Sequence, residues 1–370
     1  MKIGIDISQI QYEGTGVARY TKNLVTELLQ QDKHNTYTLF YNSFHIRLKD
    51  VLGARVLLSS SARICEFSLP EKVLHIMWNV FSFISIEHFI GRQDIYFYSD
   101  WFTPPTNAYT FTTVHDLAFK LFPQTVHPYV RAAQERRLYR ISNKKRNSVF
   151  ADSISTKNDL QKYYPIESGR IKVIHPGVIS QKQNSGKVKE TLLRYKLTER
   201  EFILVVGTLE PRKNLSRLFE AYATIQGNIP LVVAGKNGWG IITSNDSRIR
   251  MIGFVNDEEL FALYQNALFF VMPSLYEGFG FPAVEAMSLG CPVCLSRTSS
   301  LVEIGADVAV FFDPLSVSDI VRALQTLLTD ASLRKRTIQK GLVRARKFNW
   351  AVTAHQVIHE FNRVEGILAT

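Results

Sequence analysis

The sequence predicts an α/β fold made of two doubly wound, Rossmann-like domains, each built on a parallel sheet. Short apolar runs without a polar face, such as Phe202–Gly207 and Ala267–Met272, have the length and composition of strands buried on both faces. Segments with helical apolar spacing alternate with these runs, and turns rich in glycine or proline separate them. The 370 residues, 46% of them hydrophobic, suffice for two cores of ordinary domain size.

The first half opens with a strand at Lys2–Ser8, followed by a glycine loop and a helix. The loop contains Gly14 and Gly16. A dinucleotide-binding fingerprint needs a third glycine, but Arg19 stands at that position, and the loop is too long for the motif. Two interpretations remain: a flexible turn, or a loop that brings the backbone of Gly16 close to a ligand.

Further elements of the first half follow at regular spacing. Strands are predicted at Thr36–Tyr41, Arg55–Leu58 and Asp94–Tyr98. Between the last two, Val73–Ile90 is strongly apolar and aromatic but is interrupted by polar residues. We interpret it as a helix packed on the sheet, with a membrane-touching face as the alternative.

A His-Asp pair marks the end of the next predicted strand, Phe111–Leu117. His115 and Asp116 come at its carboxyl end, which is the edge of an open α/β sheet where ligands bind. A lone histidine is more often structural than functional. The pairing with a carboxylate at a strand end favours a functional role, in which Asp116 orients the imidazole or binds a hydroxyl group of a substrate.

Residues 131–146 form a predicted helix dense in arginine and lysine. Solvated charge is the ordinary interpretation of such a run, and a patch for anionic lipid is the alternative. Strands at Val149–Asp152 and Ile171–Val178 complete the first half. The polar tract Ser180–Lys189 is the predicted linker, so residues 1–180 and 190–351 are the predicted domains.

The second half restarts with the strand Phe202–Gly207, and a basic pair follows it. Arg212 and Lys213 stand just before a helix predicted to begin near Asn214. A strand-end loop before a helix N-terminus is a suitable place for a diphosphate. The alternative is a pair of solvated surface charges that bind nothing. Later strands are predicted at Pro230–Gly235 and Arg250–Val255.

The stretch Met272–Pro292 contains the most informative pattern in the chain. A buried strand leads into a turn rich in glycine, then a helix and a further strand, which together make one βαβ unit. The turn contains Glu277, with Gly278 and Gly280 allowing close approach of the backbone to a ligand. Glu285 is predicted in the first helical turn, where an acid that complements the helix dipole is the alternative to a ligand contact.

The segment from Glu277 to Glu285 resembles the E-x7-E signature of the retaining glycosyltransferases of family four, and the other stretches extend the resemblance over nearly the whole chain. The resemblance implies the GT-B arrangement, with two Rossmann-like domains facing a central cleft and a C-terminal helix, residues 352–370, crossing back to the first domain. It also implies roles for single residues. They are catalysis by His115 and Glu277, donor diphosphate binding by Gly16, Arg212 and Lys213, donor sugar binding by Gly278, Phe279 and Gly280, and nucleotide binding by Phe254, Val255 and Glu285.

The same resemblance implies transfer of a sugar from a nucleotide-sugar donor to a glycan or lipid-linked acceptor. The loops look most like those of mannosyltransferases of lipopolysaccharide or O-antigen synthesis, so GDP-mannose is the first choice of donor. No Asp-x-Asp occurs in the sequence, and a transfer that needs no metal or other cofactor is expected. One departure is Thr208, which stands where many members have a basic residue. The alternatives are a sugar-nucleotide 2-epimerase and a non-catalytic sugar-nucleotide-binding protein.

The composition of the chain indicates which partners and which cellular location to expect. The net charge of +11 and the pI near 9.5 favour an anionic partner, but no nucleic-acid-binding motif occurs, so nucleic acid ranks last. No apolar run approaches the roughly 18–20 residues of a membrane-spanning helix. We therefore expect a cytoplasmic protein, with attachment to the inner face of the membrane as a further expectation. Cys291 and Cys294, on opposite faces of a strand, are expected to be core residues.

Overall fold

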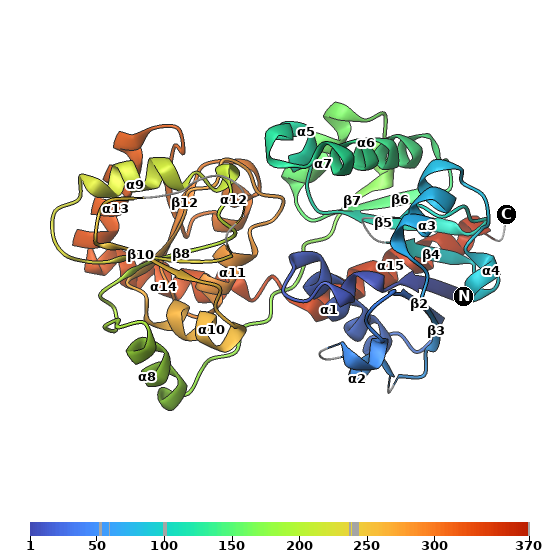
Figure 1. Cartoon of the computed structure of the whole chain (residues 1–370), viewed down its shortest axis with the longest axis horizontal. Helices are drawn as coiled ribbons and strands as arrows, with labels where there is room; N and C mark the ends of the chain where they lie inside the picture. The colour runs from blue at the N-terminus through green and yellow to red at the C-terminus, as the bar shows by residue number, and fades with distance from the viewer. Residues whose placement is uncertain (52–53, 59, 99–101, 237, 239–243, 369–370) are drawn as a thin grey trace. The chain divides into compact units, whose positions relative to one another are not determined.

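The computed structural model describes residues 1–51, 54–58, 60–98, 102–236, 238 and 244–368. The chain divides into two compact units (Figure 1). Unit 1 contains Met1–Lys120, Val126–Gly177 and Asn349–Thr370, and unit 2 contains Leu121–Thr125 and Val178–Phe348. The first half of the sequence and the last helix therefore form one unit, and the predicted linker begins just after the division at Gly177.

Unit 1 is built on a sheet of seven described strands in the order β3-β2-β1-β4-β5-β6-β7, and every pair of neighbours is parallel. Helices α6 and α7 lie on one face, and α1 and α15 lie on the other (Figure 1). The strands are β1 Lys2–Asp6, β2 Thr36–Asn42, β3 Arg63–Phe67, β4 Ile95–Tyr98, β5 Tyr109–Val114, β6 Asn147–Ala151 and β7 Ile171–Val173. The helices are α1 Gly16–Gln31, α2 Arg55–Leu58, α3 Glu71–Leu74, α4 Glu87–Ile90, α5 Ala118–Leu121, α6 Pro128–Asn143, α7 Ile154–Tyr163 and α15 Trp350–Leu368.

Two predictions for unit 1 are wrong. Arg55–Leu58 is the short helix α2, and the strand that follows β2 is β3, Arg63–Phe67. β3 is the edge strand and is only half-buried, so its sequence lacks the continuous apolar run of the inner strands. Val73–Ile90 is not one helix: it comprises the end of α3, the π-helical segment η3 (His75–Val80), a turn and α4.

Unit 2 is built on a sheet of six described strands in the order β10-β9-β8-β11-β12-β13, again parallel throughout. The order reverses between β8 and β11, and such a switch point is where open α/β sheets bind ligands. The strands are β8 Ile203–Val206, β9 Leu231–Ala234, β10 Ile249–Gly253, β11 Phe269–Met272, β12 Val293–Ser296 and β13 Val310–Phe312. The helices are α8 Ser185–Arg194, α9 Leu215–Ala223, α10 Asp257–Asn266, α11 Phe281–Ser288, α12 Ser299–Gly305, α13 Val317–Thr329 and α14 Ala331–Ala345.

The sheet of unit 2 separates two apolar clusters. One contains side chains of α10, α11 and the end of α14, and the other contains side chains of α9 and α13. Cys291 belongs to the first cluster and Cys294 to the second, and both thiols are free and buried. Burial raises the pKa of Cys291 to about 12, so this thiol stays protonated. The prediction of two core cysteines is confirmed.

Apart from the short segment Leu121–Thr125, the chain passes between the units at Gly177–Val178 and again at Phe348–Asn349. The two passages lie side by side, because Val178 N donates to Phe348 O at 3.1 Å. A β-carbon on Gly177 would lie 2.2 Å from Trp350 N, so only glycine fits there. Helix α15 then packs against α1 within unit 1. No helix among the described residues is long and apolar enough to cross a membrane.

Candidate active site

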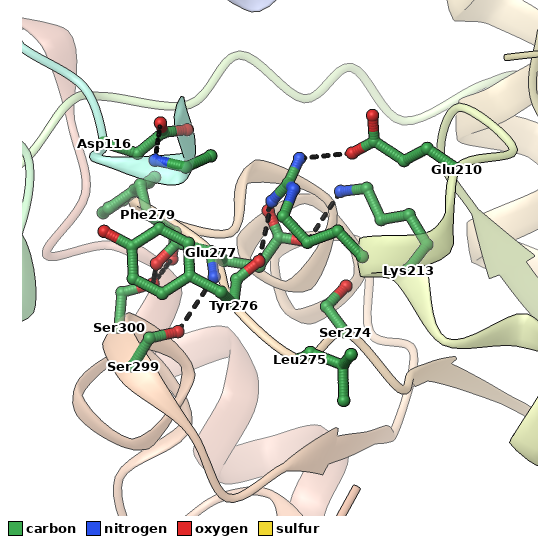
Figure 2. A network of polar contacts seen from close by, with 12 residues as sticks. Asp116, Glu210, Lys213, Ser274, Leu275, Tyr276, Glu277, Phe279, Ser299 and Ser300 are labelled. Atoms are coloured by element: carbon green, nitrogen blue, oxygen red, sulfur yellow. Dashed lines mark hydrogen bonds and ion pairs between the residues drawn. The ribbon is translucent and has the colours of Figure 1, made fainter. Parts of the chain in front are cut away.

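A buried carboxylate paired with two cations lies at the carboxyl edge of the unit 2 sheet. Glu277, in the loop after β11, is 7% exposed. Lys213 Nζ lies 2.6 Å from its Oε1, and Arg212 Nη1 lies 3.2 Å from its Oε2 (Figure 2). The sequence predicted all three residues as parts of one site, and unit 2 brings Glu277 into direct contact with Lys213 and Arg212, which lie 64 and 65 positions before it.

Local backbone geometry explains why the two cations meet the acid. After β8 the chain makes a 3-10 turn, η6 (Pro211–Lys213), and Asn214 follows in the left-handed region with φ of 57°. Asn214 Nδ2 donates to Pro273 O at 3.1 Å and to Pro314 O at 2.7 Å. Leu275 N donates to Arg212 O at 2.8 Å. The loops after the neighbouring strands β8 and β11 are thus fastened together. Sequence reasoning named Asn214 only as a helix start and missed this function.

Arg212 has more partners than Lys213. Its Nη1 donates to Tyr276 O at 2.7 Å, and its Nη2 lies 2.6 Å from Glu210 Oε1. The guanidinium therefore connects the β8 loop to the β11 loop and holds Glu277 from one side. Lys213 extends across Gly207 and reaches Glu277 from the other. The two cations are not equivalent: Arg212 is bound to several fixed groups, whereas among the described residues Lys213 Nζ is paired with Glu277 Oε1.

The electrostatics of the site keep Glu277 ionised. Burial alone would raise the pKa of this carboxyl, but the charges of Lys213 and then Arg212 outweigh it and lower the pKa to about 2. Two cationic side chains, Lys213 and Arg212, thus face a single carboxylate charge. An anion that approached Lys213 and Arg212 would compete with Glu277 for the same donors.

The turn that carries Glu277 is anchored by two serines of helix α12. Glu277 N donates to Ser299 Oγ at 2.9 Å, and Ser300 Oγ donates to Glu277 O and Phe279 O at 2.9 and 2.8 Å (Figure 2). Gly280 has φ of 103°, and a β-carbon there would lie 2.7 Å from Leu301 Cδ2. The side chain of Phe279 packs in the core, so only its backbone is available to the loop surface. Gly278 is buried in the same turn.

Glu285 lies away from the helix start. Helix α11 begins at Phe281, so Glu285 is in its second turn, and the interpretation as a dipole-complementing first-turn acid is wrong. Its side chain is buried, and Tyr264 Oη donates to its Oε2 at 3.4 Å. Phe254 follows β10 with 60% of its side chain exposed and Lys236 Nζ 4.9 Å from its ring, whereas Val255 packs in the core.

Unit 1 has a histidine–aspartate pair at the carboxyl edge of its sheet. His115 Nδ1 lies 2.7 Å from Asp152 Oδ2, and the Tyr20 ring packs edge-on against the imidazole at 4.7 Å. Because Val114 pairs with Ala151 in neighbouring parallel strands, the next residues emerge side by side. Asp152 therefore orients the imidazole, which is one of the two functions predicted for Asp116. The Oδ1 atom of Asp116 instead accepts a hydrogen bond from Ala118 N at 2.8 Å.

The glycine loop of unit 1 adjoins a cavity. Gly16 is exposed at the first position of α1, and no described atom would lie within 4 Å of a β-carbon there. A cavity of about 660 Å³ lies beside this loop, within the roughly 300–1,000 Å³ of small-molecule sites. Tyr12, Phe102 and Tyr129 supply aromatic walls. Gln9 is buried at the cavity, and its Oε1 has no hydrogen-bond partner among the described residues.

Comparisons with known proteins agree with this architecture. Residues 14–182 match the model of Glycosyltransferase Family 4, and residues 194–344 match that of Glycosyl transferases group 1. O-antigen chain mannosyltransferase B of Escherichia coli is 27% identical over an alignment that covers 98% of this chain and 99% of that protein.

Solved structures show the same fold across the whole chain. Sucrose-phosphate synthase from Thermosynechococcus elongatus has a TM-score of 0.74 at 18% identity, over 99% of this chain and 100% of that chain. Anabaena Alr3699/HepE, solved in complex with UDP and glucose, has a TM-score of 0.70 at 13% identity, over 98% and 100%. With both halves matched by glycosyltransferase models and the sheets of that fold in place, the chain belongs to the GT-B glycosyltransferases.

Proposed function

We propose that this glycosyltransferase moves a mannosyl residue from a nucleotide-sugar donor, GDP-mannose as first choice, to a glycan or lipid-linked acceptor in O-antigen-type polysaccharide synthesis. The name of the relative that spans the whole chain supports the mannosyl group and the polysaccharide. The complexes of HepE with UDP and glucose support a nucleotide-sugar donor in general. We further propose retention of anomeric configuration and a reaction without a metal ion.

The observation that carries this proposal is the Glu277 site. In transfer, the anomeric carbon becomes cationic while the departing diphosphate becomes anionic. Glu277 supplies a permanent negative charge beside the sugar, and Lys213 and Arg212 supply positive charge for the diphosphate. Each charged hydrogen bond to phosphate contributes on the order of 1.5–3 kcal/mol, so two or three together replace much of what a divalent cation would supply.

The proposed step is a front-face displacement without a covalent intermediate. The acceptor hydroxyl oxygen forms a bond to the anomeric carbon on the face that the diphosphate leaves. The bond from that carbon to the diphosphate oxygen breaks, and its electron pair stays on the oxygen. The hydroxyl proton passes to the same departing oxygen, so no protein base is required. The side chains stabilise the separated charges instead of taking a proton.

The remaining site residues take the roles that the family resemblance assigns. Glu285 binds the ribose hydroxyls, and its buried bond from Tyr264 orients the carboxylate for that contact. The backbone at Phe254 and Val255 reads the base, and the backbone of the turn at Gly278, Phe279 and Gly280 lies against the sugar. In unit 1, Gly16 faces the diphosphate, and His115, oriented by Asp152, stabilises the donor sugar.

The unit 1 cavity is the proposed acceptor site. Aromatic walls pack against the apolar faces of sugar rings, and amide groups bind hydroxyls. Gln9 is the amide best placed for this, because its buried Oε1 has no described partner. Gln9→Leu should raise KM for the acceptor and leave KM for the donor unchanged. An equal rise for both substrates would argue against the assignment.

The location that we propose is the cytoplasmic face of the membrane, with peripheral attachment.

One experiment separates the proposed activity from its rivals. A thermal-shift screen of nucleotide sugars identifies the donor, because a tight ligand raises Tm by mass action. Transfer from that donor is then measured with and without a chelator. We expect the largest shift with GDP-mannose and full activity in chelator. Loss of activity that only magnesium or manganese restores would contradict the metal-free mechanism. Release of an altered sugar without acceptor would identify an epimerase, and binding without any turnover would identify a binding protein.

A further inference from the structure

A short segment of unit 1 presents apolar side chains to solvent. Six large apolar residues in residues 73–84 have exposed fractions from 41% to 69%. We call this group the apolar patch, and it consists of Val73, Ile76, Val80, Phe81, Phe83 and Ile84. Several exposed apolar side chains on one short segment mark a contact surface more often than chance exposure does.

The segment that carries the apolar patch is held in place by its own backbone and by a buried anchor. Trp78 is fully buried in the unit 1 core, and its Nε1 donates to Ile84 O at 3.0 Å. Phe81 N donates to Ile76 O at 3.0 Å, and Ser82 Oγ donates to Trp78 O at 3.2 Å. These bonds anchor the turn on the carbonyls of Ile76, Trp78 and Ile84, and the exposed side chains of Phe81 and Phe83 belong to this anchored turn.

A basic helix lies against the same segment. Arg140 of α6 donates from Nη1 to Trp78 O at 2.8 Å, which ties α6 to η3. Arg136 and Arg140 also line a small hollow with His75 and Asn79 of η3. The exposed cations of the stretch 131–146 are Arg131, Arg136, Lys145 and Arg146. Positive charge thus borders the apolar patch.

We propose that the apolar patch and the basic stretch 131–146 together dock on an anionic lipid surface. Apolar side chains enter the boundary between headgroups and acyl chains, and the neighbouring cations bind the anionic headgroups. A second copy of the chain fits less well, because two faces with the same positive charge repel each other. The inference extends the peripheral attachment proposed above to a named surface, and it does not depend on the donor chemistry.

The docking surface lies next to the proposed acceptor cavity. His75, in the segment that carries the apolar patch, and Tyr129, at the start of α6, both line the unit 1 cavity, and their rings lie 5.3 Å apart. A chain docked through this surface holds the cavity next to the lipid headgroups. An acceptor glycan that is attached to a membrane lipid then enters the cavity while its lipid anchor stays in the bilayer.

Vesicle flotation of the full-length protein tests the inference without any substrate. We expect binding to vesicles of phosphatidylethanolamine and phosphatidylglycerol and much weaker binding to phosphatidylcholine alone. Replacing Phe81 and Phe83 together by serine should weaken binding to the anionic vesicles at least about tenfold, because apolar burial supports interfacial binding. Arg131→Gln and Arg136→Gln should each weaken it about fivefold at low salt, with little effect at high salt.

Matched controls separate docking from folding and from catalysis. Leu193 and Leu315 of unit 2 are as exposed, at 68% and 64%, so replacing both by serine should leave flotation unchanged. The phenylalanine variant should keep the Tm of the unsubstituted protein and its transfer to a water-soluble acceptor. Failure of the unsubstituted protein to float, or equal flotation of the phenylalanine variant, would overturn the proposal. So would concentration-dependent dimers abolished by that variant, which would identify a second copy as the partner.

Discussion

The two sheet edges hold their buried acids in different ways. In unit 1, Asp152 is paired with His115, a ring whose charge depends on its protonation state. In unit 2, Glu277 is paired with two side chains that carry basic groups, Lys213 and Arg212. The first pair is suited to orienting one side chain. The second is suited to keeping a fixed charge where a charged transition state forms. Asp152 thus acts by positioning a neighbouring side chain, whereas Glu277 acts through its charge, and the substitutions below test this comparison.

Glu277→Gln should have the largest effect on turnover. The neutral amide no longer stabilises the cationic sugar, and we expect kcat to fall about 10³-fold, near the upper end for the loss of one electrostatic group. Lys213 and Arg212 lose their competitor, so nucleoside diphosphate should bind as tightly or more tightly in calorimetry. The matched control is Glu259→Gln, another buried glutamate in an ion pair, with Arg194 at 2.6 Å. Normal turnover in Glu277→Gln would show that the charge of Glu277 does not stabilise the transition state, and the proposed difference between the two sheet edges would then be wrong.

His115→Ala should have the next largest effect, a loss of about 10²-fold in kcat. Asp152→Asn acts only through the imidazole, so we expect a smaller loss of roughly tenfold, because the tautomer and the orientation of His115 change. In the His115→Ala background, Asp152→Asn should then cost nothing further. A double-mutant cycle on kcat measures this. Additive losses would show that Asp152 has a role independent of His115.

Acid unfolding should reveal the fixed charge of unit 2. The pKa of Glu277 is lowered from 4.5 to about 2, so its contribution to stability is present above pH 4.5 and is lost as pH falls toward 2. At 1.36 kcal/mol per pKa unit this contribution is about 3 kcal/mol. Lys213→Met should weaken this part of the acid dependence, as followed by denaturant unfolding at each pH. Lys335→Met, at an exposed position of α14, should leave the dependence unchanged.

The smallest effect is expected at the second buried glutamate of unit 2. Tyr264→Phe removes a long hydrogen bond of 3.4 Å to Glu285 and should change the free energy of unfolding by about 0.5 kcal/mol. The affinity for the nucleotide should fall about twofold, since the carboxylate keeps its place in α11. A tenfold loss of affinity would mean that Tyr264 itself binds the donor.

Sequence patterns predicted the parts of the site that local spacing determines. Glu277 and the Arg212–Lys213 pair each follow an apolar strand, and strand ends of a parallel sheet meet at one edge. Asp152 was missed because its partnership with His115 depends on the register Val114–Ala151 between strands far apart in sequence. A register of this kind is set by tertiary packing and cannot be read from either strand alone.

Errors in the predicted elements have the same physical origin. Arg55–Leu58 has strand-like residues but forms the helix α2, because tertiary context overrides the weak propensity of a four-residue segment. The start of α11 was placed at Pro282 instead of Phe281, and that shift put Glu285 in the wrong turn. The packing of the Phe279 side chain against Phe348 is likewise a contact that only the fold reveals.

The paired passages at Val178 and Phe348 make most of unit 2 a single insertion into the chain of unit 1. Its two ends meet across one backbone hydrogen bond, so excising residues 178–348 leaves Gly177 and Asn349 as neighbours that a minimal linker can rejoin. Residues 178–348 can accordingly be produced as one uninterrupted polypeptide, while Leu121–Thr125 of unit 2 stays in the chain of unit 1. Residue 177 must remain glycine in the rejoined chain, because the β-carbon of a bulkier residue would clash with Trp350.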